Sequence, residues 1–169
     1  MNLITVAHMR NGRLDPIDLK ILAAVQREGR LAKAALSERV NLSPTPCWTR
    51  LRRLEAMGLI RGYHAEIALD RVGAFATFFV EVTLKQHRYE DFQRFEAAIG
   101  KVDAVIECVA IGGGIDYVLK IVAADIEAYQ RLIDDLLVRE IGIERYFTYV
   151  VTRTVKTRAQ APVSLVAAG

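Results

Sequence analysis

The hydrophobic pattern of this chain changes its period after Gly58, and that change restricts the fold more than any other feature. Before it, apolar residues recur every three or four positions, as on one face of an amphipathic helix: Leu14, Ile17, Ile21 and Val25. After it, apolar residues recur at every second position, as in a half-buried strand: Phe78, Val80, Val82 and Leu84. The pattern therefore predicts a helical module followed by a module that contains a β-sheet.

We expect three short helices in the first module, over about residues 15–28, 33–40 and 44–57. Ser43 and Pro44 suit the start of the third helix, because a Ser hydroxyl can hold free amides and Pro needs no amide partner there. The residues of this helix that we expect to face the core recur at helical spacing: Cys47, Leu51 and Leu54. Residues 59–65 are typical of a short strand pair, or wing.

The second module predicts strands near 75–84, 102–111, 117–122 and 144–156, with a helix over 89–99 and another that begins after Asp125. The second of these helices is expected to bury one stripe of side chains: Ile126, Tyr129, Ile133 and Leu136. The order β-α-β-β-α-β is that of the ferredoxin-like fold, an antiparallel four-stranded sheet with two helices on one face.

The predicted fold class is therefore α+β. A winged helix-turn-helix domain occupies residues 14–65, and a linker follows over 66–74. A ferredoxin-like βαββαβ domain takes 75–158, and 159–169 is expected to be a flexible tail because it is rich in small residues.

The charge of the chain is divided unevenly between these modules. Residues 1–64 hold 11 Lys and Arg against 5 Asp and Glu, whereas residues 65–169 hold 12 against 15. A basic first module suits a polyanion, since phosphates neutralised by Lys or Arg release their condensed counterions. No apolar run reaches the ~20 residues of a membrane span, and residues 1–15 do not resemble an export signal, so a cytoplasmic protein is expected.

Catalytic and metal chemistry find little support in the sequence. Cys47 and Cys108 are 61 residues apart, and neither has a Cys or His at ligand spacing. We find no Ser/His/Asp set, phosphate-binding loop or dinucleotide motif. The chain is therefore predicted to hold no metal and not to be an enzyme.

The third helix is the strongest candidate for a binding surface. If its apolar stripe faces the core, Thr45, Thr49, Arg50 and Arg53 are displaced toward solvent. Arginine can bind a guanine edge or a phosphate, and hydroxyls can contact either. The alternative is a capped surface helix whose arginines serve solubility. Trp48 either stacks on the first helix or lies along a DNA backbone.

A second candidate is the glycine-rich loop 111–117. Its open amides can hold a carboxylate and Asp116 an ammonium group, so the loop is able to bind both ends of a zwitterion. The alternative is a tight hairpin in which glycine only supplies positive φ.

Several segments, in this order, resemble the Lrp/AsnC (feast/famine) family of transcriptional regulators. The matching segments cover about residues 14–158: 29–30, 42–47, 50–55, 58–63 and 116–120. The resemblance implies that 33–52 is a helix-turn-helix and that an α/β domain binds an effector and forms oligomers. The DNA-binding set comprises Ser43, Pro44, Thr45, Trp48, Thr49, Arg50, Arg52 and Arg53. The effector-binding set comprises Gly112, Gly113, Gly114, Asp116, Tyr117, Ile126, Thr148, Tyr149, Val150 and Val151.

By the same resemblance, the partners are double-stranded DNA, further copies of the chain (a homodimer or a larger assembly such as an octamer) and an amino-acid-like effector. No other cofactor and no membrane is implied. Gly112 and Gly114 stand where relatives often carry bulkier residues, which leaves room for a larger ligand. Residues 112–117 and 142–149 are similar to regulators associated with the breakdown of ectoine or related diamino acids.

Three other functions stay open at this point. The first is an architectural DNA-binding protein of the same fold that takes no effector. The second is an amino-acid-sensing module whose first domain binds protein, although the basic charge fits this poorly. The third is a small enzyme with a ferredoxin-like domain, for which no catalytic residues are found.

Overall fold

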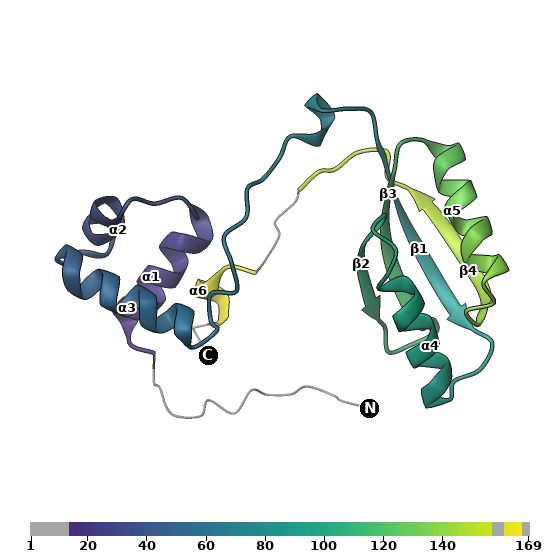
Figure 1. Cartoon of the computed structure of the whole chain (residues 1–169), viewed down its shortest axis with the longest axis horizontal. Helices are drawn as coiled ribbons and strands as arrows, with labels where there is room; N and C mark the ends of the chain where they lie inside the picture. Colours follow the sequence, from purple (N-terminus) through teal and green to yellow (C-terminus); the bar gives the residue numbers. More distant parts are fainter. Residues whose placement is uncertain (1–13, 157–160, 167–169) are drawn as a thin grey trace. The chain divides into compact units, whose positions relative to one another are not determined.

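The computed structural model describes residues 14–156 and 161–166. These residues divide into two compact units (Figure 1). The N-terminal unit holds residues 14–66 together with 161–166, and the C-terminal unit holds 67–156. Each unit has its own apolar core.

The N-terminal unit is built from α1 (Pro16–Arg27), α2 (Lys33–Val40) and α3 (Pro44–Ala56). Asp15 caps α1 by accepting hydrogen bonds from the amides of Ile17 and Asp18, and the Asp18 side chain accepts one from the amide of Asp15. Asn41, at φ 55°, ends α2 in the left-handed region and so turns the chain toward α3. The expected inward residues Cys47, Leu51 and Leu54 are all buried.

Two predictions for this unit need correction. Residues 59–65 form no strand, and the Tyr63 hydroxyl there donates instead to Glu55 of α3 at 2.9 Å. The Ser43 side chain makes no capping hydrogen bond, so Pro44 begins α3 without one. In the part of the tail that the structure describes, α6 (Val163–Val166) packs on α1, and Val163 contacts the core of the unit.

The C-terminal unit contains β1 (Ala76–Leu84), α4 (Tyr89–Ile99), β2 (Val105–Ala110), β3 (Tyr117–Ala123), α5 (Ile126–Val138) and β4 (Ile143–Val150). The strands form one sheet in the order β2-β3-β1-β4, and each neighbouring pair is antiparallel. This arrangement confirms the predicted ferredoxin-like fold. A short 3-10 helix, η1 (Leu69–Arg71), precedes β1.

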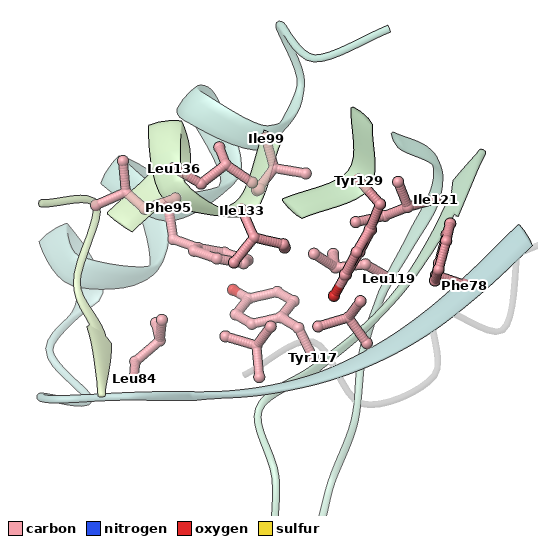
Figure 2. Close-up of a cluster of buried hydrophobic side chains, with 13 residues drawn as sticks. Phe78, Leu84, Phe95, Ile99, Tyr117, Leu119, Ile121, Tyr129, Ile133 and Leu136 are labelled. Atoms are coloured by element: carbon pink, nitrogen blue, oxygen red, sulfur yellow. The ribbon is translucent and has the colours of Figure 1, made fainter. Parts of the chain in front are cut away.

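The core of this unit lies between the sheet and the two helices α4 and α5 (Figure 2). The alternating residues of β1 that were predicted to face inward are all buried: Phe78, Val80, Val82 and Leu84. Phe78 stacks on Tyr129 of α5 with ring centroids 4.0 Å apart, and Phe95 of α4 contacts Tyr117 of β3 with centroids 4.6 Å apart. Both helices therefore cover the same face of the sheet.

Other boundaries differ from the expectation in detail. β2 and β4 are shorter than predicted, because pairing with β3 and β1 ends before the apolar sequence does. Ile126 was placed on the buried stripe of α5 but is 64% exposed. Helical spacing aligns it with Tyr129, but burial also requires an element opposite the first turn, and the described part of this chain supplies none.

The opposite face of the sheet carries no helix of the described chain. It exposes a group of large apolar side chains from three strands: Phe79, Val109, Phe147 and Tyr149. No helix of the parts described here is long and apolar enough to cross a membrane.

Candidate functional site

The outward surface of α3 is the first candidate site. Thr45 and Thr49 are exposed in its N-terminal half, and Arg52 and Arg53 are exposed one turn further on. A hollow of about 500 Å³ lies next to these side chains. It is lined by Asp15, Thr45, Pro46, Thr49, Arg50 and Arg53. The end of a helix where base contacts usually concentrate thus borders an open, basic depression.

A buried carboxylate fixes the arginines of α3. Asp18 of α1 is completely buried, and its two oxygens bind Arg50 Nη1 at 2.9 Å and Arg53 Nη2 at 2.5 Å. Arg50 Nη1 also lies 2.5 Å from Asp15 Oδ2. The network joins α1 to α3 by charge-assisted hydrogen bonds, which are stronger than neutral ones.

The charges of this network perturb one another. The hydrogen bonds to Asp15 and then to Asp18 raise the pKa of the Arg50 guanidinium above its ordinary value. The amide of Asp18 and then the Arg50 side chain lower the pKa of Asp15. Both shifts favour the charged forms, so the pairs persist at neutral pH.

The prediction for Arg50 therefore needs correction. Its side chain is 31% exposed and pairs with α1, whereas the apolar stripe alone placed it toward solvent. Thr49 is exposed as predicted, but its hydroxyl donates to the carbonyl of Thr45 at 3.1 Å. Arg53 keeps a side chain that is 48% exposed while it binds Asp18.

Trp48 is half-buried against the core of the N-terminal unit, and two cations flank its ring. Lys33 Nζ lies 3.9 Å from the ring centroid, and Arg52 Cζ lies 4.7 Å from it. Trp48 thus packs within its own unit, with Lys33 of α2 and Arg52 of α3 at its ring. The sequence analysis missed Lys33, whose signal was its place as the first residue of α2, beside α3 in a helix-turn-helix.

The glycine-rich loop between β2 and β3 is the second candidate site. Gly112, Gly113 and Gly114 are exposed, and a Cβ added to any of them would meet no atom within 4 Å. None of the three has positive φ, which among the described glycines occurs at Gly58 and Gly142. The loop joins β2 and β3 as an antiparallel hairpin, as the alternative predicts, but its three glycines do not supply positive φ.

Asp116 is largely engaged inside its own unit. Its Oδ2 accepts a hydrogen bond from the Leu84 amide at 2.8 Å, and its Oδ1 lies 3.0 Å from His87 Nε2. The side chain is only 15% exposed. The carboxylate therefore fastens the start of β3 to the end of β1 and is paired with His87.

The other predicted effector residues do not converge on this loop. Tyr117 is buried beneath α4, where its hydroxyl donates to Glu96 at 2.7 Å; burial and then Glu96 raise its pKa. Tyr117 pairs with Val82 of β1, whereas Val150 pairs with Phe78, four residues away along the same strand. This separation is about 13 Å at the rise of a β-strand. Ile126 follows the end of β3 that lies with Val150, away from the glycines.

Residues of β4 are also divided between the two faces of the sheet. The Thr148 side chain points toward the helices and is hydrogen-bonded to the Tyr129 hydroxyl. Tyr149 lies on the uncovered face, where its hydroxyl donates to Glu81 at 3.2 Å. Val150 and Val151 close the strand, and the Val151 amide donates to the carbonyl of Thr77. One chain thus does not bring the effector-binding set into a single pocket.

The remaining reactive side chains form no cluster. A shallow pocket of about 320 Å³ lies between α4 and β2 and includes Glu96, Glu107 and Cys108. Burial, and next the charge of Glu96, raise the pKa of the Cys108 thiol, which disfavours a reactive thiolate. Across residues 14–156 and 161–166, no three His, Cys, Asp or Glu side chains gather in a way that could hold a metal ion.

Comparisons with known proteins cover both units. The family model described as the Lrp/AsnC ligand binding domain matches residues 77–161, and that of a winged helix-turn-helix DNA-binding domain matches 14–61. The chain is 50% identical to the transcriptional regulatory protein DoeX of Halomonas elongata over 153 residues, which cover 90% of this chain and 96% of DoeX. It is 41% identical to the leucine-responsive regulatory protein of Escherichia coli K12 over 143 residues, 85% of this chain and 87% of that protein.

A solved structure is similar over nearly the same length. It is a transcriptional regulator of Neisseria meningitidis in complex with L-Met, 32% identical, with a TM-score of 0.84. The match covers 91% of this chain and 99% of that one.

The charge network yields a prediction about stability. Replacing Arg50 by Glu places a third carboxylate beside Asp15 and Asp18, so the N-terminal unit should melt several degrees lower. Trp48 is the single tryptophan of the chain and lies in this unit, so its fluorescence reports the transition. Arg39→Glu is the matched control, because Arg39 pairs with Glu28 on the surface, where an ion pair contributes little.

The effect should depend on pH in a defined direction. Because the folded state lowers the pKa of Asp15, its pairing stabilises the fold above the ordinary value of 3.8 and is lost as the pH falls through the lowered value. The gap between the melting temperatures of native chain and Arg50→Glu should therefore narrow below about pH 4. Equal melting temperatures at pH 7 would show that the network does not hold α3.

Proposed function

Since this chain belongs to the Lrp/AsnC family of transcriptional regulators, we propose that it binds specific duplex DNA through the outward face of α3. We further propose that it controls genes of amino-acid metabolism and responds to an amino acid or a derivative of one. The observation that carries the proposal is the open hollow beside the N-terminal half of α3.

The side chains around this hollow suit the major groove. Thr45 and Thr49 offer hydroxyl and methyl groups to base edges, and Arg53 keeps donors free for guanine or phosphate while Asp18 holds one side of its guanidinium. Ser43 and Pro44 are exposed at the start of the helix, next to this surface. Arg50 acts indirectly in this proposal, by holding α3 on α1.

Lys33 and Arg52 are proposed to contact phosphates. Both carry their charge against the ring of Trp48, and a cation over an indole face is held in place by the ring's quadrupole. This arrangement presents two positive charges from neighbouring helices at fixed positions beside the proposed reading face. Phosphate contacts of this kind set the register of a protein on the duplex.

The architectural alternative predicts different behaviour. A DNA-compacting protein of the same fold would bind selected and random duplexes with similar affinity and ignore small molecules. The proposed regulator prefers a sequence, and specific complexes of this kind are typically 10³–10⁷ times tighter than non-specific ones.

The interface predicts distinct effects for two kinds of variant. Lys33→Ala and Arg52→Ala should each reduce the magnitude of the slope of log affinity against log salt concentration by about one. Both should weaken binding to duplexes of any sequence to the same extent. Thr45→Val should mainly reduce the preference for a duplex selected by the native chain from a random pool. Arg131→Ala, on the exposed surface of α5, should change neither, as measured by fluorescence anisotropy. A slope unaltered in both Lys33 and Arg52 variants would remove these residues from the interface.

We propose a homodimer formed through the uncovered face of the sheet. Phe79, Phe147 and Tyr149 are each about half exposed there, with Glu81 and Lys120 among them, and large exposed apolar side chains gathered on one face usually mark an interface. A second copy would bring the same patch, as a two-fold symmetric contact requires. The dimer would carry two copies of α3, so that it can occupy two half-sites of one operator.

Charge at the centre of this face should prevent dimerisation. Phe147→Arg is expected to shift the sedimentation coefficient to that of a smaller species in analytical ultracentrifugation, since two buried arginines would face each other. Tyr89→Arg is the matched control, because Tyr89 is 71% exposed on α4. A Phe147 variant that keeps the native assembly would place the interface elsewhere.

The effector site is proposed to be completed by another subunit. The glycine loop and the end of β4 lie apart within one chain, so a pocket that uses both needs a second copy. The loop amides would hold the ligand carboxylate, and its ammonium would compete with His87 for Asp116. An L-Met complex of the Neisseria regulator supports a ligand of this class.

A ligand screen with an Asp116 variant tests this site. The twenty amino acids, ectoine and short diamino acids would be added singly, and a ligand that binds only the native state raises the melting temperature. Asp116→Asn keeps an acceptor for the Leu84 amide and should abolish the increase for the active compound. Asp116→Ala is a poorer choice, because it also removes the hydrogen bond that fastens β3 to β1.

The control is Asp103→Asn, on an exposed turn of the same unit. An undiminished increase in Asp116→Asn would show that the ligand binds elsewhere. An absence of any increase in the native chain would instead favour the architectural alternative.

A further inference from the structure

The C-terminal segment 161–166 is held on α1 by one polar side chain. Gln26 Nε2 donates to the carbonyl of Ala161 at 2.8 Å, and Gln26 Oε1 accepts from the amide of Val163 at 2.9 Å. Val163 packs against the core of the N-terminal unit, whereas Leu165 is 72% exposed. The contact places the end of the chain back in the unit with which the chain begins (Figure 1).

The two units are consequently joined twice. The first connection runs from Tyr63, which is hydrogen-bonded to Glu55 of α3, to Ala76 at the start of β1. The second runs from Val151 to Ala161. Both leave the C-terminal unit at the same place, because the Val151 amide donates to the carbonyl of Thr77 at 2.9 Å.

The two connections differ in length. Residues 64–75 lie in the first and residues 152–160 in the second. At a maximum of about 3.5 Å per residue, the first can span at most about 45 Å and the second at most about 35 Å. While segment 161–166 stays on α1, the shorter connection therefore limits how far the two units can separate.

We propose that the Gln26 surface of α1 is a docking site for the chain's own C-terminal segment, which acts as a releasable second tether. The contact comprises two hydrogen bonds to an exposed side chain and one apolar residue, so it can open without unfolding of the domain. Docking is favoured because the covalent connection keeps the segment at high local concentration.

Such a tether would affect DNA binding because it limits the largest distance between the two units of the chain. The half-sites of a two-fold operator lie about 34–36 Å apart per helical turn. A docked segment narrows the range of positions that the helix-turn-helix unit can take, and release widens it. This consequence rests on the proposed function, whereas the docking itself does not.

The test measures the reach in the free protein. Spin labels would be attached at Glu38→Cys and Glu127→Cys, both exposed, in a Cys108→Ser background that leaves only buried Cys47. Labelled chains would be diluted with unlabelled chains, and double electron–electron resonance would give the distance distribution. Native chain, Gln26→Ala and a deletion of residues 161–169 would be compared, with Leu165→Ser as control.

Docking predicts that Gln26→Ala and the deletion both extend the longest distances, by up to about 10 Å, the difference between the two maximum lengths. Leu165→Ser should match the native chain. Distributions that are the same in the native chain and in Gln26→Ala would overturn the proposal, and this comparison decides even where the deleted chain folds poorly. A further sample would mix labelled native chains with unlabelled chains that lack residues 161–169. If the distance distribution broadens in this sample, the segment docks on a partner chain, and the proposal is overturned. No DNA is present, so failure here is distinct from failure of DNA binding.

Discussion

The carboxylate of Asp18 has no contact with water, and the arrangement of the DNA-binding unit depends on how its charge is neutralised. A buried charge is costly unless it is paired and hydrogen-bonded. Asp18 meets this requirement through Arg50 and Arg53, both of which come from α3. The helix proposed to read DNA is therefore positioned by electrostatics on one side and by the packing of Leu51 and Leu54 on the other. This pairing therefore also fixes the positions of the hydroxyl and guanidinium groups on the outward face of α3.

Most of the fold could be predicted from the sequence, but the predicted position of the Arg50 side chain was wrong. The spacing of apolar residues along the chain, every three to four positions or every second position, predicted α1 to α5 and all four strands. The Lrp/AsnC resemblance is confirmed by the family models. Arg50 was expected in solvent because it flanks the apolar stripe of α3. The missed signal is in α1, where Asp18 lies three and four residues before buried Ile21 and Leu22 and so shares their face. A carboxylate on a buried face requires a cation nearby, although spacing alone does not say which one.

The C-terminal unit shows a different limit. Alternation in β1 correctly identified its buried face, because one chain supplies all the partners of those residues. The effector-binding set came from the family resemblance, and within one chain it divides between two ends and two faces of the sheet. Three glycines with ordinary φ and open surroundings have no explanation inside the chain. Both observations are accounted for if copies of the chain assemble, and a single sequence does not contain that geometry.

The proposed DNA binding requires that α3 faces outward in a fixed orientation. Photocrosslinking tests this orientation directly. A photoreactive phenylalanine derivative would replace Thr45, beside the hollow, or Arg131 on α5, and each chain would be irradiated with a labelled duplex selected by the native protein. The account predicts efficient crosslinking from position 45 and little from position 131. Crosslinking from position 45 that is no greater than from position 131 would contradict it.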